Sequence, residues 1–526
     1  MRASLILKSV TATWMAVIVS AATSFLLTPL ILHRLGDEAY GIWVLSVTLT
    51  DYYCFLQVGV RSAVVRYVSR NLALDDVGAI RRIVSTSFYF YITLAGVSLV
   101  LVFGFAPYVT RFFTVSAIYA GSFTGLFVLL GIAQAFDFPL SLSEGCLEAV
   151  GRFDQLYGIR IAGMLIRVTA ILIVLKRGGG LLGVGAATVL SILLPRFLSY
   201  VLAFIEVKGF TFHLREFDWK IFRKMIGYGA TSFAVGMGAH LRNALYPVVI
   251  AKFLSSSAVT LFSIPAKLLS VPLNGIGSMT EFVSPLSSQM EARQDKEGLR
   301  RLLIMSTEAA CLLFAPMGVI MIVFGRQVIT LWVGTAYGAT YSLLVLLTFG
   351  MGVSTTQAAT QSMLFGIGRH KPLVAMRFTE GIGTAALGIL FLHFWGLWGY
   401  ALASMIVPVV VNLFVVPRYA CNLVELPYFT YLAKGWLKAC LYSIPLAFSL
   451  LVFEHFWPIA HWKQLILGCL AGGIIYLLTL AVSSLLSRKF QVRWSKLETL
   501  AILERKYFGN PTPGEVNVNS AVGWFN

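Results

Sequence analysis

Charged residues are scarce in this chain of 526 residues: Asp, Glu, Lys and Arg make up 12% of it, whereas 58% is hydrophobic. A soluble globular protein carries roughly a quarter charged residues, so the composition excludes that class. The alternation of apolar and polar residues over about ten positions that marks outer-membrane strands is absent as well. The apolar runs that the chain does contain can each cross about 30 Å of hydrocarbon as a helix. We therefore predict an all-α polytopic membrane protein.

Cysteines are also few, and no two of them form a CxxC pair. This scatter indicates neither a disulfide framework nor a metal site. A Ser/His/Asp set is absent too, so the sequence predicts neither an enzyme nor a bound metal or cofactor. The six cysteines are Cys54, Cys146, Cys311, Cys421, Cys440 and Cys469.

The lengths of the apolar runs predict about fourteen transmembrane helices. Their approximate positions are 5–32, 40–65, 82–106, 121–149, 155–175, 181–205, 225–251, 259–287, 299–324, 338–366, 371–392, 396–417, 434–453 and 464–486. The first run is too long for the core of a signal peptide, so we expect it to be kept as the first helix. Residues 488–526 begin basic and end polar with Pro and Gly, which predicts a cytoplasmic tail that is partly disordered.

The net charge of +18 follows the predicted topology. Lys and Arg lie mainly in every second connection, roughly 27 of them against about 7 in the opposite connections. By the positive-inside rule, the N and C termini both lie in the cytoplasm. The positive charge is therefore a topology signal, and we expect no nucleic-acid partner.

The sequence repeats itself with an offset of about 217 residues. Residues 75–84 (DDVGAIRRIV) match residues 295–304 (DKEGLRRLLI), which aligns Arg81-Arg82 with Arg300-Arg301. A second match aligns Gly151-Arg152 with Gly368-Arg369 and brings Arg160 onto Arg377. Three more matches occur in the same order: 29–43 with 247–262, 105–115 with 324–334, and 180–188 with 396–404.

These matches predict two parallel repeats of six helices. The repeats cover about 1–215 (spans 1–6) and 220–425 (spans 7–12), and 426–487 adds spans 13 and 14. Since six is even, both repeats enter the membrane from the same side, an arrangement that is typical of secondary transporters with substrate bound between the halves. The alternative is an ancient duplication that was kept in a scaffold or an enzyme.

Several of these segments resemble a known family. The opening pattern TPLILHRLGDEAYGIWVL, the segment LQVGVRSAVVRYVSR and the GR pairs after spans four and ten are similar to the polysaccharide and oligosaccharide flippases. That family belongs to the multidrug/oligosaccharidyl-lipid/polysaccharide exporter superfamily. The resemblance implies two six-helix lobes in a V, with a cleft lined largely by spans one, two, seven and eight.

The resemblance also implies a function in the bacterial inner membrane. The expected activity is alternating-access translocation of an undecaprenyl-pyrophosphate-linked oligosaccharide for cell-surface polysaccharide biosynthesis. The headgroup would pass through the cleft while the lipid tail stays outside it. Expected partners are this lipid-linked oligosaccharide, membrane lipids, and a polysaccharide polymerase or glycosyltransferases.

Charged residues inside the predicted spans are the candidates for contact with such a headgroup. A charge at the bilayer centre costs at least about 2.5 kcal/mol, so each is a functional candidate by default. Arginine and lysine suit the oxygens of a pyrophosphate. The candidates are Arg242, Lys267, Asp51, Arg61, Arg167 and Arg196.

Each candidate also has an alternative interpretation. Most intramembrane charges pair with one another, and Asp51 with Lys267 is a plausible pair across the cleft. Arg61 lies near the end of its span, where snorkelling explains it without a ligand. Arg167 and Arg196 lie on spans that the family places further from the cleft, which favours a structural role.

Ion coupling needs a titratable group at mid-depth, and H⁺ or Na⁺ is the expected coupling ion in this superfamily. Glu380, about 15 Å along span eleven, is the main candidate. Asp51, His240, Asn243 and Asn412 are further candidates. A satisfied packing role is the alternative for Glu380, and a static pair within one lobe is the alternative for Asp51.

Two rival functions share parts of the pattern. A multidrug or cation antiporter of the same fold would need an acidic or aromatic cavity. A membrane glycosyltransferase or polymerase would need an acidic motif on a sizeable outer loop, whereas the outer loops here are short.

Overall fold

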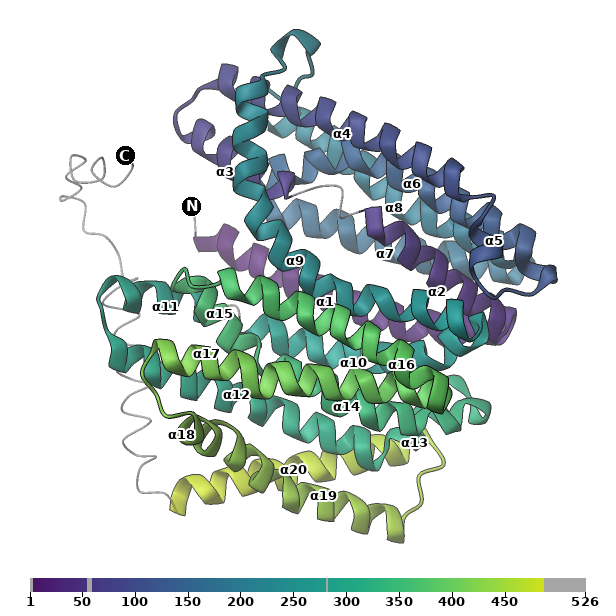
Figure 1. Ribbon diagram of the computed structural model, residues 1–526, viewed down its shortest axis with the longest axis vertical. Coiled ribbons are helices and arrows are strands. Elements are labelled where there is room, and N and C mark those ends of the chain that lie inside the picture. The colour runs from purple at the N-terminus through teal and green to yellow at the C-terminus, as the bar shows by residue number, and fades with distance from the viewer. Residues whose placement is uncertain (1–2, 54–58, 281, 487–526) are drawn as a thin grey trace.

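The structure is a computed structural model that describes residues 3–53, 59–280 and 282–486. Within these ranges, the description leaves out the side chains of residues 3–14, 17, 228–232, 235–236, 239–240, 242–243, 278 and 484–486. Cys54 and the predicted tail at 488–526 lie outside the described residues. All regular secondary structure in the described ranges is helical (Figure 1), which confirms the predicted all-α class.

The described part of the first repeat contains eight α-helices, and we name this half of the molecule the N-lobe. They are α1 (Ala3–Leu35), α2 (Asp37–Asp51), α3 (Val60–Ala73), α4 (Val77–Phe105), α5 (Val109–Phe112), α6 (Ala117–Val150), α7 (Phe153–Lys176) and α8 (Gly180–Glu206). Helix α6 packs on α4 and α8, and α7 packs on α8 and α1. A connection with the short turn η2 (Leu214–Glu216) leads to the second repeat.

The second repeat, which we name the C-lobe, begins with a helix that touches both halves. Its elements are α9 (Trp219–Phe253), α10 (Ser256–Met279), α11 (Val283–Ala292), α12 (Lys296–Val323), α13 (Gly325–Val333), η3 (Thr335–Thr340), α14 (Tyr341–Thr356), α15 (Ala358–Gly366), α16 (Lys371–Val409), η4 (Val410–Val415) and α17 (Val416–Leu423). Helix α9 packs on α16 of the C-lobe and on α2 and α3 of the N-lobe. It therefore links the two lobes.

The chain after the second repeat adds helices on the far side of the C-lobe. They are α18 (Tyr428–Leu432), η5 (Ala433–Leu437), α19 (Lys438–Phe456) and α20 (Trp462–Leu486). Helices α19 and α20 pack on each other, and α19 packs on α12 (Figure 1).

Eleven segments of the described chain are long and apolar enough to span a membrane. One of them, Lys371–Leu423, is 53 residues long and covers two predicted spans. The two spans meet at Gly396, where the backbone leaves the helical conformation with a φ of 56°. In α9 only Ala244–Phe253 is a continuous apolar stretch among the described residues. The count of fourteen therefore stays a prediction.

Two predicted spans are not single helices. The span predicted at 40–65 is broken, since α2 ends at Asp51 and α3 begins after Gly59, whose φ of 67° is left-handed. Its repeat counterpart, predicted at 259–287, is broken between Met279 and Val283. Discontinuous helices at corresponding places of two repeats mark the binding region in many transporters.

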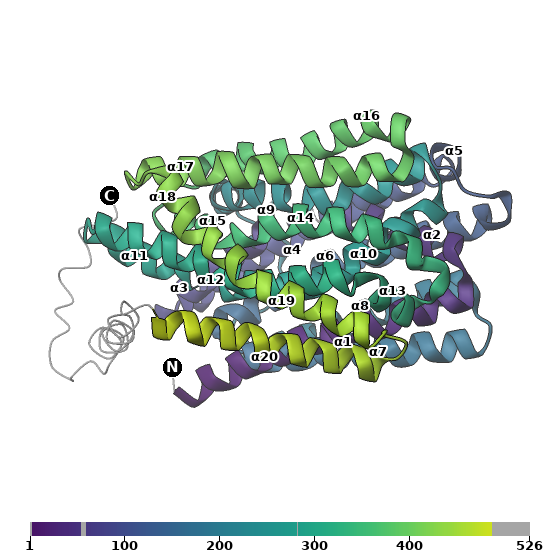
Figure 2. The same cartoon turned by 90° about the horizontal axis from the view of Figure 1, so that it is seen from below.

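The lobes meet at one end of the bundle, which we name the closed end (Figure 2, right side). There the Thr260 hydroxyl donates to the Asp37 carbonyl at 2.6 Å, and the Tyr337 hydroxyl donates to the Asp37 carboxylate at 3.1 Å. The Thr114 amide donates to the Ala251 carbonyl at 3.2 Å. These bonds join the N-lobe to the C-lobe directly.

A glycine permits the close approach of α2 and α10 at this end. A methyl group added to Gly41 would overlap the backbone carbonyl of Ser256. The opposite end, which we name the basic end, carries the connections 74–76, 151–152, 207–218, 293–295 and 424–427. By the positive-inside rule the basic end is predicted to be cytoplasmic.

Candidate functional site

A cavity of about 270 Å³ lies between the lobes, next to the break in the second span. Its walls come from α1, α2, α7, α9 and α10, and its lining contains hydroxyl groups, aromatic rings and two cations. The lining residues are Thr23, Ser24, Leu27, Thr28, Trp43, Val44, Val47, Thr48, Arg167, Tyr246 and Lys267. Neither Asp nor Glu is among them.

Lys267 on α10 reaches across to the N-lobe. Its Nζ donates to the Tyr40 hydroxyl at 2.7 Å and lies 4.8 Å from the ring centroid of Trp43. The Tyr40 hydroxyl in turn donates to Thr28 at 3.4 Å. The predicted pair of Lys267 with Asp51 is not present, and the described residues offer the ammonium group aromatic and hydroxyl partners instead.

Arg167 on α7 approaches the same tryptophan. Its guanidinium carbon lies 5.7 Å from the Trp43 ring centroid, so the indole contacts two cations from two lobes. The Arg167 Nε and the Trp43 Nε1 are buried and have no hydrogen-bond partner within the described part of the chain. Arg167 therefore belongs to the cavity, although the sequence favoured a structural role for it.

Asp51 lies at the end of α2 with an exposed side chain. The Asp51 carboxylate interacts electrostatically with the Arg167 guanidinium group. Within the described residues, the two groups do not form an ion pair of 4 Å or less. The predicted candidates on α9 are Arg242, His240 and Asn243, whose side chains lie outside the described residues. Their roles stay predictions.

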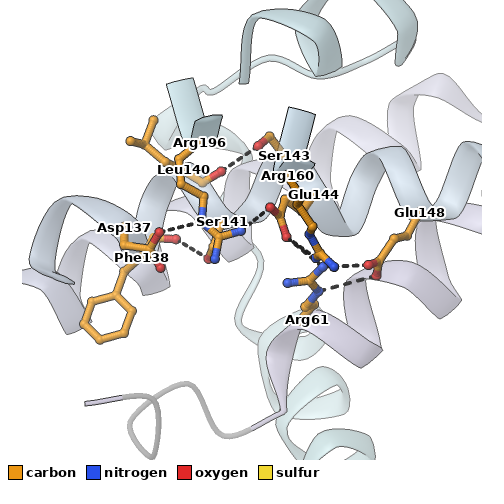
Figure 3. A network of polar contacts seen from close by, with 10 residues as sticks. All are labelled: Arg61, Asp137, Phe138, Leu140, Ser141, Ser143, Glu144, Glu148, Arg160 and Arg196. Carbon is orange, nitrogen blue, oxygen red and sulfur yellow. Dashed lines mark hydrogen bonds and ion pairs between the residues drawn. The ribbon is translucent and has the colours of Figure 1, made fainter. Parts of the chain in front are cut away.

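Arg61 and Arg196 lie elsewhere, in an ion-pair network inside the N-lobe (Figure 3). Arg196 Nε is 2.6 Å from Asp137, and its Nη1 also pairs with Glu144. Arg61 Nη2 is 2.9 Å from Glu144 and 2.6 Å from Glu148. The network joins three cations to three carboxylates: Arg61, Arg160, Arg196, Asp137, Glu144 and Glu148. This balance favours the structural alternative for both predicted arginines.

Glu380 and Asn412 are brought together in the C-lobe, as a polar cluster. Glu380 is buried, with 1% of its surface exposed. Its carboxylate accepts hydrogen bonds from Arg377 at 3.3 Å and from Ser354 at 3.1 Å. Asn412 donates to the same Ser354 at 3.1 Å and accepts from Gln361 at 3.3 Å. Arg377 also donates to Gln361.

Trp43, which lines the cavity, and the buried Tyr40 that bonds to Lys267 both escaped the sequence analysis. Tyr40 and Trp43 are three positions apart and therefore share one face of α2. The same spacing is equally common among residues that only pack in a protein core. The position of Lys267 opposite Tyr40 and Trp43 is what distinguishes a binding site from core packing here. The arrangement suits an anion with hydroxyl groups, because two cations converge on a cavity lined by threonine, serine and tyrosine side chains.

Comparisons with known proteins identify a family and a shared fold. A family model described as a polysaccharide biosynthesis protein matches residues 31–342. A "Putative O-antigen transporter" of Shigella flexneri is 20% identical over 380 residues, which are 70% of this chain and 87% of the relative.

Solved structures share the fold. The lipid II flippase MurJ in an inward closed conformation superposes with a TM-score of 0.73 at 14% identity, over 91% of this chain and 98% of that one. An inward-facing multidrug resistance transporter of the MATE family in the MOP superfamily gives 0.68 at 14% identity, over 78% and 94%.

Proposed function

The chain belongs to the polysaccharide biosynthesis protein family, and from this premise we propose that it is a flippase-type membrane transporter of the MOP superfamily rather than an enzyme. The substrate is an undecaprenyl-pyrophosphate-linked oligosaccharide, and the membrane is the bacterial inner membrane. The headgroup passes between the lobes by alternating access, and the product feeds cell-surface polysaccharide biosynthesis, where a polymerase or glycosyltransferases act on it.

One observation carries the proposal: Lys267 and Arg167 reach one cavity from different lobes without a carboxylate partner at ion-pair distance in the described residues. Placing two cations inside a membrane is costly unless a compensating charge is bound. A pyrophosphate supplies that charge, and the threonine and tyrosine hydroxyls can contact the first sugar. A cation antiporter would meet repulsion here.

The cavity volume defines what this state can hold. At about 270 Å³ it is slightly smaller than the usual range of about 300–1,000 Å³ for small-ligand pockets. It suits a pyrophosphate with part of one sugar and excludes a whole oligosaccharide. The lobes must therefore separate further during transport, and the hydrogen bonds at the closed end are the contacts that would break.

Access follows from the same contacts. With the closed end sealed, the headgroup enters from the basic end, which we propose is cytoplasmic along with both termini. Lys267 and Arg167 hold the phosphates in this state. Opening of the closed end separates α10 from α2, and this motion withdraws Lys267 from Tyr40 and Trp43, so the two-cation site is divided and the headgroup is released.

Coupling to H⁺ or Na⁺ is assigned to Glu380. Protonation of Glu380 would remove its ion pair with Arg377 and loosen the link through Ser354 to Asn412. These residues lie on α14, α16 and the η4 segment, so the change would alter packing within the C-lobe. Asp51 near Arg167 is a second acidic group whose protonation would raise the positive charge around the cavity.

The test is translocation of a lipid-linked oligosaccharide in proteoliposomes. Lys267→Gln keeps a polar hydrogen-bond donor and removes the charge, so we expect loss of most of the transport rate, with partial recovery in Lys267→Arg. Lys463→Gln removes an equal charge from an exposed position on α20 and serves as the matched control. Equal rates for Lys267→Gln and Lys463→Gln would refute the role of the cavity.

A further inference from the structure

A second cavity, of about 670 Å³, lies at the basic end, where the connection between the lobes crosses α4. Four basic residues line it: Arg81 and Arg82 on α4, Arg215 on η2, and Lys220 at the start of α9. Phe217 and Trp219 complete the wall, and Trp219 is 65% exposed. The cavity thus combines a group of cations with aromatic side chains.

The two acidic residues of this cavity are already engaged. Glu216 forms an ion pair with Arg81 at a distance of 2.7 Å. The Asp218 carboxylate accepts hydrogen bonds from the Lys220 amide at 2.7 Å and the Ile221 amide at 3.2 Å, which caps α9. Arg82, Arg215 and the Lys220 ammonium group have no carboxylate at ion-pair distance among the described residues, so the cavity keeps an excess of positive charge.

The sequence repeat provides an internal comparison. Arg300 and Arg301 on α12 are the counterparts of Arg81 and Arg82. Arg300 lies 3.3 Å from Glu425, and Arg301 lies 3.2 Å from Glu297. Lys296 pairs with Glu425 at 2.6 Å, and this hydrogen bond lowers the pKa of Glu425. Among the described residues, both arginines of the C-lobe therefore lie within ion-pair distance of a carboxylate, whereas in the N-lobe only Arg81 does.

The walls of the cavity are held in place by buried hydroxyl groups of α4. Ser85 accepts the His213 amide at 3.2 Å, and Thr86 accepts the Asp218 amide at 3.1 Å. Both hydroxyl residues are 0% exposed. The connection is fixed on α4 on both sides of η2, so the cations are positioned before any ligand arrives.

We propose that this cavity binds the headgroup of an anionic phospholipid from the leaflet at the basic end. Charge complementarity selects a negative headgroup, since each basic residue near an anionic membrane surface contributes to the attraction. Trp219 and Phe217 are exposed beside these cations, and exposed aromatic side chains commonly anchor membrane proteins at the interface. A lipid held there touches both α4 of the N-lobe and the start of α9, the helix that joins the lobes.

The experiment measures lipid binding to the purified full-length protein in detergent. Native mass spectrometry follows titrations with phosphatidylglycerol and with phosphatidylcholine. The test variant is Arg82→Ala/Arg215→Ala, and the matched control is Lys296→Ala/Arg301→Ala, which removes the same charge from paired residues at the same end. We expect about a fivefold loss of phosphatidylglycerol affinity for each cation removed from the cavity, roughly 25-fold for the test variant.

The control variant should change that affinity less than about threefold, because its cations are paired. Melting temperatures in detergent confirm that both variants are folded, and Arg82→Lys, which keeps the charge, should bind as the wild type does. Equal losses in the two double variants, or equal binding of the two lipids by the wild type, would overturn the proposal. Displacement of phosphatidylglycerol by soluble glycerol phosphate at similar concentration would also overturn it, in favour of a soluble anion.

Discussion

Replacement of Arg196 by methionine tests the ion-pair network of the N-lobe most sharply. Arg196 forms an ion pair with Asp137 at 2.6 Å, and it also pairs with Glu144. In Arg196→Met, Glu144 keeps Arg61 at 2.9 Å and Arg160 at 2.7 Å, whereas Asp137 loses its ion pair. The side chain of Asp137 is 7% exposed, so one buried carboxylate is left uncompensated.

Removing one partner of a buried pair costs about 3–5 kcal/mol. We therefore expect Arg196→Met to lower the free energy of unfolding by that amount. Arg301→Met is the control, since Arg301 and its partner Glu297 are 61% and 60% exposed and such pairs contribute at most about 1 kcal/mol. Unfolding by SDS in mixed micelles gives the free energies.

The double variant Arg196→Met/Asp137→Leu separates structure from transport. Because it removes both members of the pair, most of the lost stability should return. If Arg196 is structural, this variant also transports lipid-linked oligosaccharide at close to the wild-type rate. A stable double variant without transport would refute the structural role, and so would a single variant within about 1 kcal/mol of the wild type.

Three further predictions concern the cavity, the closed end and the coupling site. Cysteine at position 51, in a background in which Cys54 is replaced by serine, should react with water-soluble thiol reagents, because the Asp51 side chain is exposed; inaccessibility under all conditions would contradict a wet cleft. Gly41→Val should weaken disulfide cross-linking between cysteines at 37 and 260, because the valine side chain overlaps the Ser256 carbonyl; unchanged cross-linking would show that this glycine is not needed for closure. Glu380→Gln should abolish the response of transport to an ion gradient, and normal transport under every gradient would end the proposed coupling.

The sequence predicted the helical class, the internal repeat and the charged residues within the spans, because each depends on local composition or on self-comparison. It also aligned Arg160 with Arg377, and both arginines form ion pairs with acidic residues in their lobes. The division of the chain at 215 and 425 stays a prediction.

Partners across the fold could not be predicted in the same way. An ion pair between Lys267 and Asp51 was one interpretation of the sequence, but Lys267 bonds to Tyr40, because the α2–α10 packing places that hydroxyl 2.7 Å from its ammonium group. Arg167 was placed away from the cleft, yet α7 packs on α1 and brings it to Trp43. The breaks near Gly59 and Met279 were missed because apolar residues lie on both sides of each break, so run length alone did not divide either span.

The distribution of lipid-linked oligosaccharide between the two leaflets tests the central claim most directly. In a strain that lacks this chain, the account predicts accumulation of the undecaprenyl-pyrophosphate-linked precursor on the cytoplasmic leaflet, with transport restored by the wild type but not by Arg167→Gln/Lys267→Gln. Unchanged leaflet distribution in the deletion strain, or full restoration by the double variant, would contradict it.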